Sequence, residues 1–334
     1  MHSEITNEYC VLKNDSICLS KGLWKSYSSS LIRVNWNKNN AFLTKRVGGI
    51  RNLKRLFYYK KNEKCKIEVD FVTQTPRGSL AISFVNSLVY YNLETYLDFL
   101  VFQKKLGNFS KKMNVAQIEF LADLNVYISP YYNGTLFQKI LTKKKKKKSL
   151  LKFIDSVLSC SSSLDEVELK SFNNSYKLGY SIVKNNNFYK MNLSDKSINN
   201  IEHLLNSSKL IEGHGDLSVN NVIFLPDDEY ISIDWFDAFT IIPNWFDATH
   251  ILCTKGVELL FDSSFFSQVQ KSLMKELFMN VIDPIDLFIA WRIVWAINRS
   301  TISGTLDTVL FEKNIRFSLG TGIELLKDYN ICKA

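Results

Sequence analysis

The chain has 334 residues, which is enough for two lobes and a sizeable hydrophobic core. Its 46% hydrophobic content is ordinary for a soluble protein, and no apolar run of about 18 residues, as a transmembrane helix needs, is present. Six scattered cysteines form no Cys-x-x-Cys pair, and four histidines show no zinc-ligand spacing. The N-terminus also lacks the pattern of a secretory signal. We therefore expect reduced thiols and a cytoplasmic location.

Part of the net charge of +9 lies in an unbroken run of six lysines, Lys143 to Lys148. Because such dense like charges repel one another, we expect a solvated loop or a mobile helix end. A contact with an anionic partner or a membrane surface is the alternative. No basic motif interleaved with aromatic residues accompanies the run, so no specific nucleic-acid binding is expected.

The first part of the chain is expected to be rich in strands. Alternating or β-branched runs predict strands at 41–47, 67–73, 80–85, 115–120 and 126–132. The second and third of these form a hairpin around Pro76 and Gly78. Apolar residues at helical spacing predict a helix over 93–102. Gly134 predicts a turn after the last strand, because glycine adopts positive φ at little cost.

The later part of the chain is expected to be mainly helical. Ser194 is a suitable N-cap for a helix over 194–205. Asp283 and Pro284 predict the start of another helix, since proline fits the first helical turn. Its continuation, 287–297, is apolar nearly all round, which indicates burial. A further helix is predicted over 315–328.

Two short motifs carry the chemistry. The first places His214 and Asp216 in a His-x-Asp pattern, with Asn221 five residues after that Asp. The second places Asp234 behind a short hydrophobic strand. The residues between them predict a β-hairpin that brings Asn221 and Asp234 to neighbouring strand ends. A phosphoryl transferase needs a base for the attacking hydroxyl and hard oxygen ligands for Mg²⁺, and these residue types supply both.

These motifs resemble the catalytic core of the aminoglycoside phosphotransferase and choline kinase superfamily, the small-molecule branch of the protein-kinase fold. The firm resemblance covers roughly residues 195–250. It implies an α+β, bilobal protein-kinase-like fold with a small β-rich N-lobe and a larger, mainly helical C-lobe. We expect a divergent N-lobe at 1–130, with a possible N-terminal extension, and a C-lobe at 131–334. The catalytic loop is then 214–221 and the metal strand 231–237.

The resemblance also implies roles for individual residues. Asp216 would act as the base, while Asn221 and Asp234 would hold Mg²⁺ bridging the phosphates of ATP. His214 would belong to the catalytic loop, fixing it to the metal strand rather than acting as a general base. Asp247, in a weaker third match at 244–248, would brace the loop by accepting hydrogen bonds from backbone N–H groups.

The N-lobe departs from the family pattern. The predicted helix supplies Glu94 as the partner of a phosphate-binding lysine, but residues 79–84, the predicted strand before it, contain no lysine. Lys45 is the nearest candidate, unless it lies on an N-terminal extension and a surrogate such as Arg77 serves instead. No Gly-rich loop is evident. The backbone around Tyr131 would form the hinge on which adenine docks.

The sequence is compatible with more than one class of acceptor substrate. The chain would move the γ-phosphate to a hydroxyl of a small molecule, such as a sugar or glycolipid precursor. A cationic acceptor such as choline or an aminoglycoside is the alternative, and the net positive charge argues mildly against it. A further alternative is a kinase-fold pseudoenzyme that binds nucleotide or serves as a scaffold. Aromatic residues either line the acceptor pocket or form the core; they are Trp235, Phe236, Trp245, Trp291 and Trp295.

Overall fold

The computed structural model describes the chain in segments. They are residues 17–19, 22–26, 30–33, 55–59, 67–75, 78–93, 98–132, 134–136, 144–160, 166–185, 193–206, 208–218, 221–225, 229–237, 239–255, 260–277, 283–302 and 305–317. The chain divides into two compact units. The N-terminal unit comprises residues 1–104 and 116–133, and the C-terminal unit comprises 105–115 and 134–334. Residues 105–115 thus group with the C-terminal unit.

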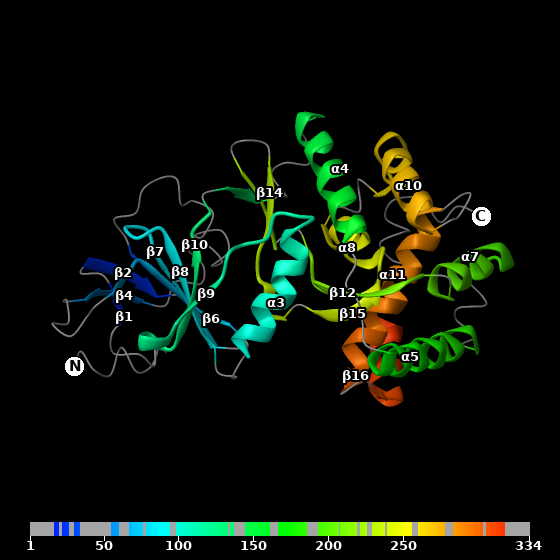
Figure 1. The fold of residues 1–334 in the computed structure, drawn as a ribbon, viewed down its shortest axis with the longest axis horizontal. Helices are drawn as coiled ribbons and strands as arrows, with labels where there is room; N and C mark the ends of the chain where they lie inside the picture. Colours follow the sequence, from blue (N-terminus) through cyan, green and yellow to red (C-terminus); the bar gives the residue numbers. More distant parts are fainter. Residues whose placement is uncertain are drawn as a thin grey trace. The chain divides into compact units, whose positions relative to one another are not determined.

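The N-terminal unit is built on one antiparallel sheet with strand order β4-β2-β3-β6-β7-β8-β10-β9 (Figure 1). Its strands are β2 (Gly22–Ser26), β3 (Ser30–Arg33), β4 (Arg55–Tyr59), β6 (Phe71–Thr75), β7 (Gly78–Ser83), β8 (Leu88–Leu93), β9 (Glu119–Leu121) and β10 (Val126–Pro130). A separate parallel pair joins β1 (Ile17–Leu19) to β5 (Ile67–Val69).

Side chains from this sheet are buried on both of its faces. Val72 and Ala81 belong to one buried cluster, whereas their chain neighbours Phe71 and Ile82 belong to another. This alternation follows from the two-residue period of a strand, which sends successive side chains to opposite faces. The hairpin predicted around Pro76 and Gly78 is confirmed, since β6 pairs with β7 from Phe71–Ile82 to Thr75–Gly78.

The helix predicted over 93–102 is wrong at its start. Residues up to Leu93 form β8, which pairs with both β7 and β10, and α3 runs over Phe99–Ser110. Asp98 begins the helix by accepting the amide of Val101 at 3.2 Å. Within the predicted range, Leu93 is extended because it pairs with Gly78 of β7, and residues 94–97 lie outside the described residues. The strand predicted over 115–120 likewise begins only at β9, and Val115 makes an isolated bridge to Ser232.

The C-terminal unit is mainly helical (Figure 1). Its helices are α4 (Lys144–Ser159), α5 (Glu166–Asn185), α7 (Asp195–Asn206), α8 (Phe246–Lys255), α10 (Ser263–Leu277) and α11 (Pro284–Ser300), and residues 308–317 are also helical. Its small sheets are β11 (Thr135–Leu136), β13 (Val222–Phe224) and β14 (Tyr230–Ser232); β12 (Leu210–Gly213) with β15 (Thr240–Pro243); and β16 (Thr301–Ile302) with β17 (Thr305–Leu306).

Helix α11 is the buried centre of this unit and packs against α5, α7 and α8. Most of its side chains are buried, and each fully buried Leu, Ile or Phe contributes roughly 1.5–3 kcal/mol. The predicted start is confirmed, because the carboxylate of Asp283 accepts the amide of Ile285 and Pro284 occupies the first turn. Ser194 similarly accepts the amide of Ser197 at the start of α7. The helix predicted over 315–328 is described only to residue 317, as part of a helix that begins at 308.

Lys144 to Lys148 of the lysine run lie at the beginning of α4, and Lys143 lies outside the described residues. Of the two predicted positions for these lysines, a loop or a helix end, the structure shows the helix end. Lys147 pairs with Asp262 at 2.7 Å. No helix in the described part of the chain is long and apolar enough to cross a membrane.

Candidate functional site

The loop that carries Asp216 leaves β12 through two glycines that the packing requires. A Cβ on Gly213 would lie 2.2 Å from the Ile242 side chain and 2.7 Å from a carboxylate oxygen of Asp247. Gly215 has φ +76°, and a Cβ there would lie 2.7 Å from Thr240. Only glycine takes this left-handed conformation without strain while allowing so close an approach.

Asp247 holds the start of the loop. Its fully buried carboxylate accepts the backbone amides of His214 at 2.6 Å and Gly215 at 2.9 Å, as the sequence predicted. Burial raises the pKa of Asp247, although the nearby His214 and the two amide hydrogen bonds oppose this effect. The residue lies in the first turn of α8, so the loop is tied to a helix of the hydrophobic core.

His214 connects the loop to the chain that follows β14 at Ile233, which is the structural contact predicted for it. Its Nε2 lies 3.0 Å from the carbonyl oxygen of Ile233, and its Nδ1 lies 3.4 Å from the amide of Asp216. The amide can only donate, so Nδ1 accepts and Nε2 carries the proton that bonds to Ile233. The ring is buried against the edge of Trp235, with centroids 4.7 Å apart. A ring used on both nitrogens is an unsuitable general base.

The predicted hairpin forms and brings the two candidate metal ligands together. Strands β13 and β14 pair from Val222–Ser232 to Phe224–Tyr230, and the amide of Ile233 then bonds to the carbonyl of Asn221 at 2.9 Å. Asp234 follows this last rung of the ladder. It is exposed and has φ +65°, a conformation that Asp adopts more readily than most residues.

The residues at this strand end fit a divalent cation. The Nδ2 of Asn221 donates to the carbonyl of Asp216 at 2.9 Å, and no hydrogen bond to its Oδ1 is made by the residues that the structure describes. An amide oxygen and a carboxylate are the hard donors that Mg²⁺ prefers. Within the described ranges, no cluster of three or more His, Cys, Asp or Glu side chains could hold a metal. A cation here would therefore depend on Asn221, Asp234, water and phosphate oxygens.

Asp216 sits at the open end of the loop with its side chain 53% exposed. Its Oδ1 lies 3.2 Å from Nε2 of His250, whose side chain is only 2% exposed. Partial burial alone would raise the pKa of Asp216, but the hydrogen bond from His250 and the influence of His214 and Arg299 outweigh it, and the pKa is lowered. Sequence reasoning missed His250. The available signal was its position three residues after Asp247, one helical turn along α8.

Of the three residues predicted to bind the nucleotide, the structure describes only one. Lys45 and Glu94 lie outside the described residues. The strand that precedes α3 is β8, not residues 79–84, and it contains no lysine either. Tyr131 is described: its amide donates to the carbonyl of Ser87 at 2.7 Å, and its ring meets Phe84 edge-on at 5.1 Å. That amide is thus already used within the N-terminal unit.

Most of the aromatic residues considered for a pocket are core residues. Trp235 and Trp245 are fully buried, and Phe236 and Trp291 are nearly so. Each buried indole N–H has an acceptor: Ser232 for Trp235, Ser208 for Trp245 and His250 for Trp291. These bonds are 3.1, 2.6 and 3.0 Å long.

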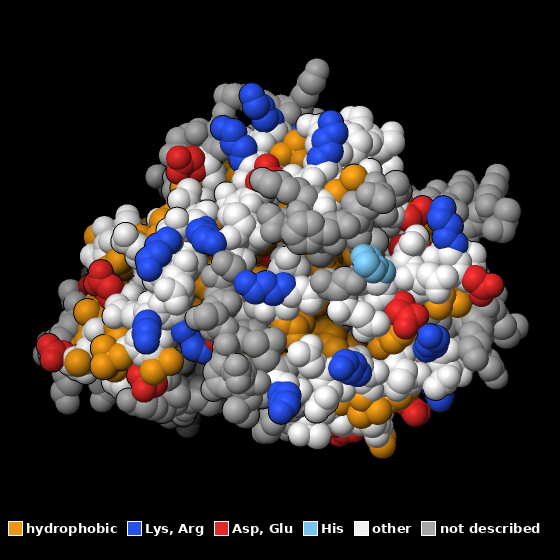
Figure 2. Space-filling model, turned by 45° about the vertical axis from the view of Figure 1, so that its right-hand side comes forward, with side chains coloured by type: hydrophobic (Ala, Val, Ile, Leu, Met, Phe, Trp, Pro, Cys, Tyr) orange, Lys and Arg blue, Asp and Glu red, His pale blue; other side chains and the backbone are white. Residues whose placement is uncertain are grey.

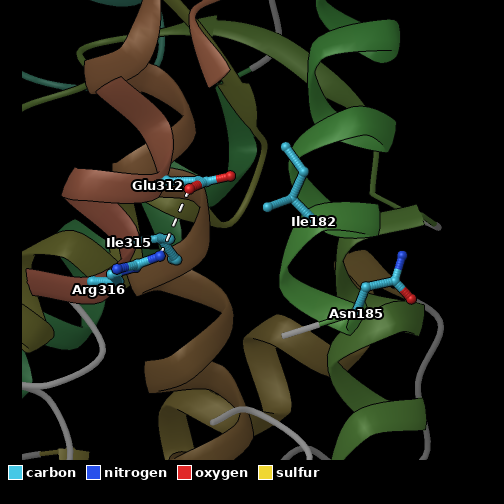
Figure 3. Close-up of a pocket in the computed structure, with 5 residues that line it drawn as sticks. All are labelled: Ile182, Asn185, Glu312, Ile315 and Arg316. Atoms are coloured by element: carbon cyan, nitrogen blue, oxygen red, sulfur yellow. Dashed lines mark ion pairs between the residues drawn. The ribbon is translucent and has the colours of Figure 1, made fainter. Parts of the chain in front are cut away.

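A pocket elsewhere in the C-terminal unit lies between α5 and the helix over 308–317 (Figure 3). Ile182 and Ile315 supply its apolar lining, and Glu312 pairs with Arg316 along one helical turn at 3.7 Å. It contains none of the residues of the candidate site. On the face drawn in Figure 2, described Lys and Arg side chains are dispersed among Asp and Glu rather than gathered in one patch.

Solved structures of small-molecule kinases match the chain. One is a choline/ethanolamine kinase family protein from Mesorhizobium loti, with 11% identity, coverage of 76% of this chain and 86% of that chain, and a TM-score of 0.44. Another is choline kinase LicA from Streptococcus pneumoniae, with 12% identity, coverage of 77% and 93%, and a TM-score of 0.45. A third is a spectinomycin phosphotransferase bound to ADP and spectinomycin. It has 13% identity, coverage of 76% of this chain and 90% of that chain, and a TM-score of 0.37.

These neighbours are of the kind that the motif resemblance predicts, but the likeness is distant. Nothing about the chemistry of this chain follows from it. No family model and no curated protein matches the sequence.

Proposed function

We propose that this chain transfers the γ-phosphoryl group of ATP to a hydroxyl of a small molecule. The observation that carries the proposal is the grouping of Asp216, Asn221 and Asp234. The first two are joined by a hydrogen bond, and the last two lie at neighbouring strand ends. Such a set supplies a base beside a hard-oxygen cation site.

Asp216 would orient the acceptor hydroxyl and take its proton. Among the described residues, Oδ2 of Asp216 has no hydrogen-bond partner, whereas Oδ1 is held by His250. As the acceptor oxygen bonds to the γ-phosphorus, the bond from that phosphorus to the β-phosphate oxygen breaks and ADP leaves. The hydroxyl proton goes to Oδ2. Mg²⁺, when bound, would neutralise charge on the phosphates.

Asn221 and Asp234 would hold that cation through amide and carboxylate oxygens. His214 and Asp247 would keep the loop and the metal strand in register, since each joins backbone groups of the site. Lys45, Glu94 and the backbone around Tyr131 stay predictions for nucleotide binding.

The acceptor is proposed to be neutral or anionic, such as a sugar or glycolipid precursor. A cationic acceptor needs free carboxylates, but three of the described acidic residues after the motifs have structural partners. Asp262 pairs with Lys147, Asp283 caps α11, and Asp286 accepts a hydrogen bond from Asn200 at 2.7 Å. The lysines at the start of α4 could attract an anionic acceptor or surface.

The test is ATP turnover with a panel of sugar, amino-alcohol and aminoglycoside acceptors. Asp216→Asn is expected to lower kcat by about 10²-fold or more, in the range of general-base contributions. Asp307→Asn is the matched control, because Asp307 is exposed, caps the helix over 308–317, and Asn caps equally well. Full transfer activity in Asp216→Asn would show that Asp216 is not the base.

A binding or scaffold function is the second candidate, and one observation favours it. Strands β6, β7 and β8 contain no lysine to contact phosphates. Binding of Mg·ATP without turnover of any acceptor would support this function. Asp234→Ala should abolish Mg-dependent ATP binding in either case, and calorimetry measures it.

A further inference from the structure

His250 holds the carboxylate of Asp216 from the buried side. The two residues lie 34 positions apart, and Nε2 of His250 is 3.2 Å from Oδ1 of Asp216. The imidazole is almost completely buried, whereas half of the Asp216 side chain is exposed. A buried ring with a fixed orientation therefore restricts a carboxylate that would otherwise rotate at the surface.

Trp291 determines which nitrogen of His250 carries the proton. The indole Nε1 of Trp291 lies 3.0 Å from Nδ1 of His250. Because an indole N–H can only donate, Nδ1 must accept and is unprotonated. The proton of the neutral ring is then on Nε2, where it points to Asp216. The chain of donors runs in one direction, from Trp291 to His250 to Asp216.

The two rings are held by the core of the C-terminal unit. His250 is on α8 and Trp291 on α11, two helices that pack together. Their ring centroids are 5.4 Å apart at an interplanar angle of 66°, an edge-to-face arrangement. Phe246 contacts the imidazole as well, at 5.4 Å. His250 therefore has few other orientations available.

We infer that His250 is a positioning residue for the phosphoryl transfer, and that Trp291 acts through it by fixing the tautomer that donates to Asp216. The inference rests on the proposed function. His250 takes no proton from the acceptor. It occupies Oδ1 of Asp216 and directs Oδ2 toward the acceptor hydroxyl, so its loss should affect the reacting state more than substrate binding.

The kinetic test compares two replacements of His250. His250→Leu removes the donor, and kcat is expected to fall about tenfold to a hundredfold with little change in either KM, as for loss of one hydrogen bond to a charged group. His250→Gln places an amide N–H near the position of Nε2 and should recover most of kcat. Wild-type kcat in folded His250→Leu would overturn the inference. Equal losses in the two variants would also overturn it, since any effect would then come from packing.

Trp291→Phe tests the second link, because it keeps an aromatic ring and removes the N–H. It should lower kcat in the wild-type background and leave kcat unchanged in the His250→Leu background. Equal effects in both backgrounds would show that Trp291 does not act through His250.

A measurement on the unaltered protein covers the case in which His250→Leu fails to fold. Among four histidines, the ring ¹⁵N signals of His250 can be assigned by their loss in His250→Gln. The expected spectrum has Nε2 protonated and Nδ1 unprotonated, and the opposite tautomer would overturn the inference. Absence of ATP turnover by the wild type with every acceptor would overturn the proposed function together with the inference. Loss of the His250 effect alone, with turnover intact, would overturn only the inference.

Discussion

The carboxylate of Asp247 accepts the backbone amide of His214 at 2.6 Å across 33 residues of sequence. This bond fixes the start of the loop that carries Asp216 to the first turn of α8. The same helix carries His250 one turn later, so one element holds both the backbone of the loop and the side chain of Asp216.

Asp247→Asn is expected to destabilise the protein. The carboxamide has one oxygen for two amides, His214 and Gly215, and its NH₂ group would face a second donor. A buried N–H without an acceptor costs about 1–3 kcal/mol, so the free energy of unfolding in urea should fall by that amount. Asp307→Asn, at an exposed cap, should change it by less than about 0.5 kcal/mol. Equal stability of the two variants would contradict the bracing role.

Gly215→Ala and Gly107→Ala should change stability in opposite directions. At Gly215 the new Cβ meets Thr240 at 2.7 Å and the backbone is left-handed, which costs roughly 1–2 kcal/mol before the clash is counted. At Gly107, within α3, a Cβ meets nothing within 4 Å. Alanine there should stabilise the helix by about 0.5–1 kcal/mol. Thermal and urea unfolding measure the stability of both variants. A Gly215→Ala variant more stable than the wild type would show that the left-handed turn is not required.

The parts of the site that the sequence predicted are those encoded locally. The order of His214, Asp216 and Asn221 and the hairpin before Asp234 depend on neighbours within about 20 residues. The bracing by Asp247 was also predicted, on the strength of the motif resemblance. Strand pairing and turn formation are short-range properties, so a pattern of residues is sufficient to predict them.

The parts of the site that the sequence did not predict depend on contacts between distant segments. His250 reaches Asp216 only because α8 folds beneath the loop, and Trp291 reaches His250 only because α11 packs on α8. The spacing of His250 from Asp247 indicates only that the two residues share a face of one helix, not which side chain His250 contacts. The start of α3 was misplaced for the same reason, since Leu93, the first residue of the predicted helix, is held in β8 by its pairing with Gly78 of β7.

Asp286→Asn is expected to stabilise the protein at neutral pH. Burial raises the pKa of Asp286 in the folded state, more than the hydrogen bonds from Asn200 and Ser197 lower it. The folded chain therefore holds a proton to higher pH than the unfolded chain does, and ionisation at Asp286 costs stability above the raised pKa. Asparagine stays neutral and can still accept the hydrogen bond from Asn200. The gain should disappear below about pH 3.8, the ordinary value, where both states are protonated. Urea unfolding at pH 7 and at low pH checks the sign.

The pH–rate profile of the proposed transfer should extend to unusually acid pH. The base must be ionised to accept a proton, and the pKa of Asp216 lies below its usual value, with the hydrogen bond from His250 as the main lowering effect. The acid limb of kcat/KM should therefore fall below the ordinary range of an aspartate, provided that the protein stays folded there. In His250→Leu the limb should move to higher pH, because burial then acts with less opposition. Folding is monitored at each pH by circular dichroism. An acid limb that does not move in the folded variant would mean that His250 does not set the protonation of Asp216.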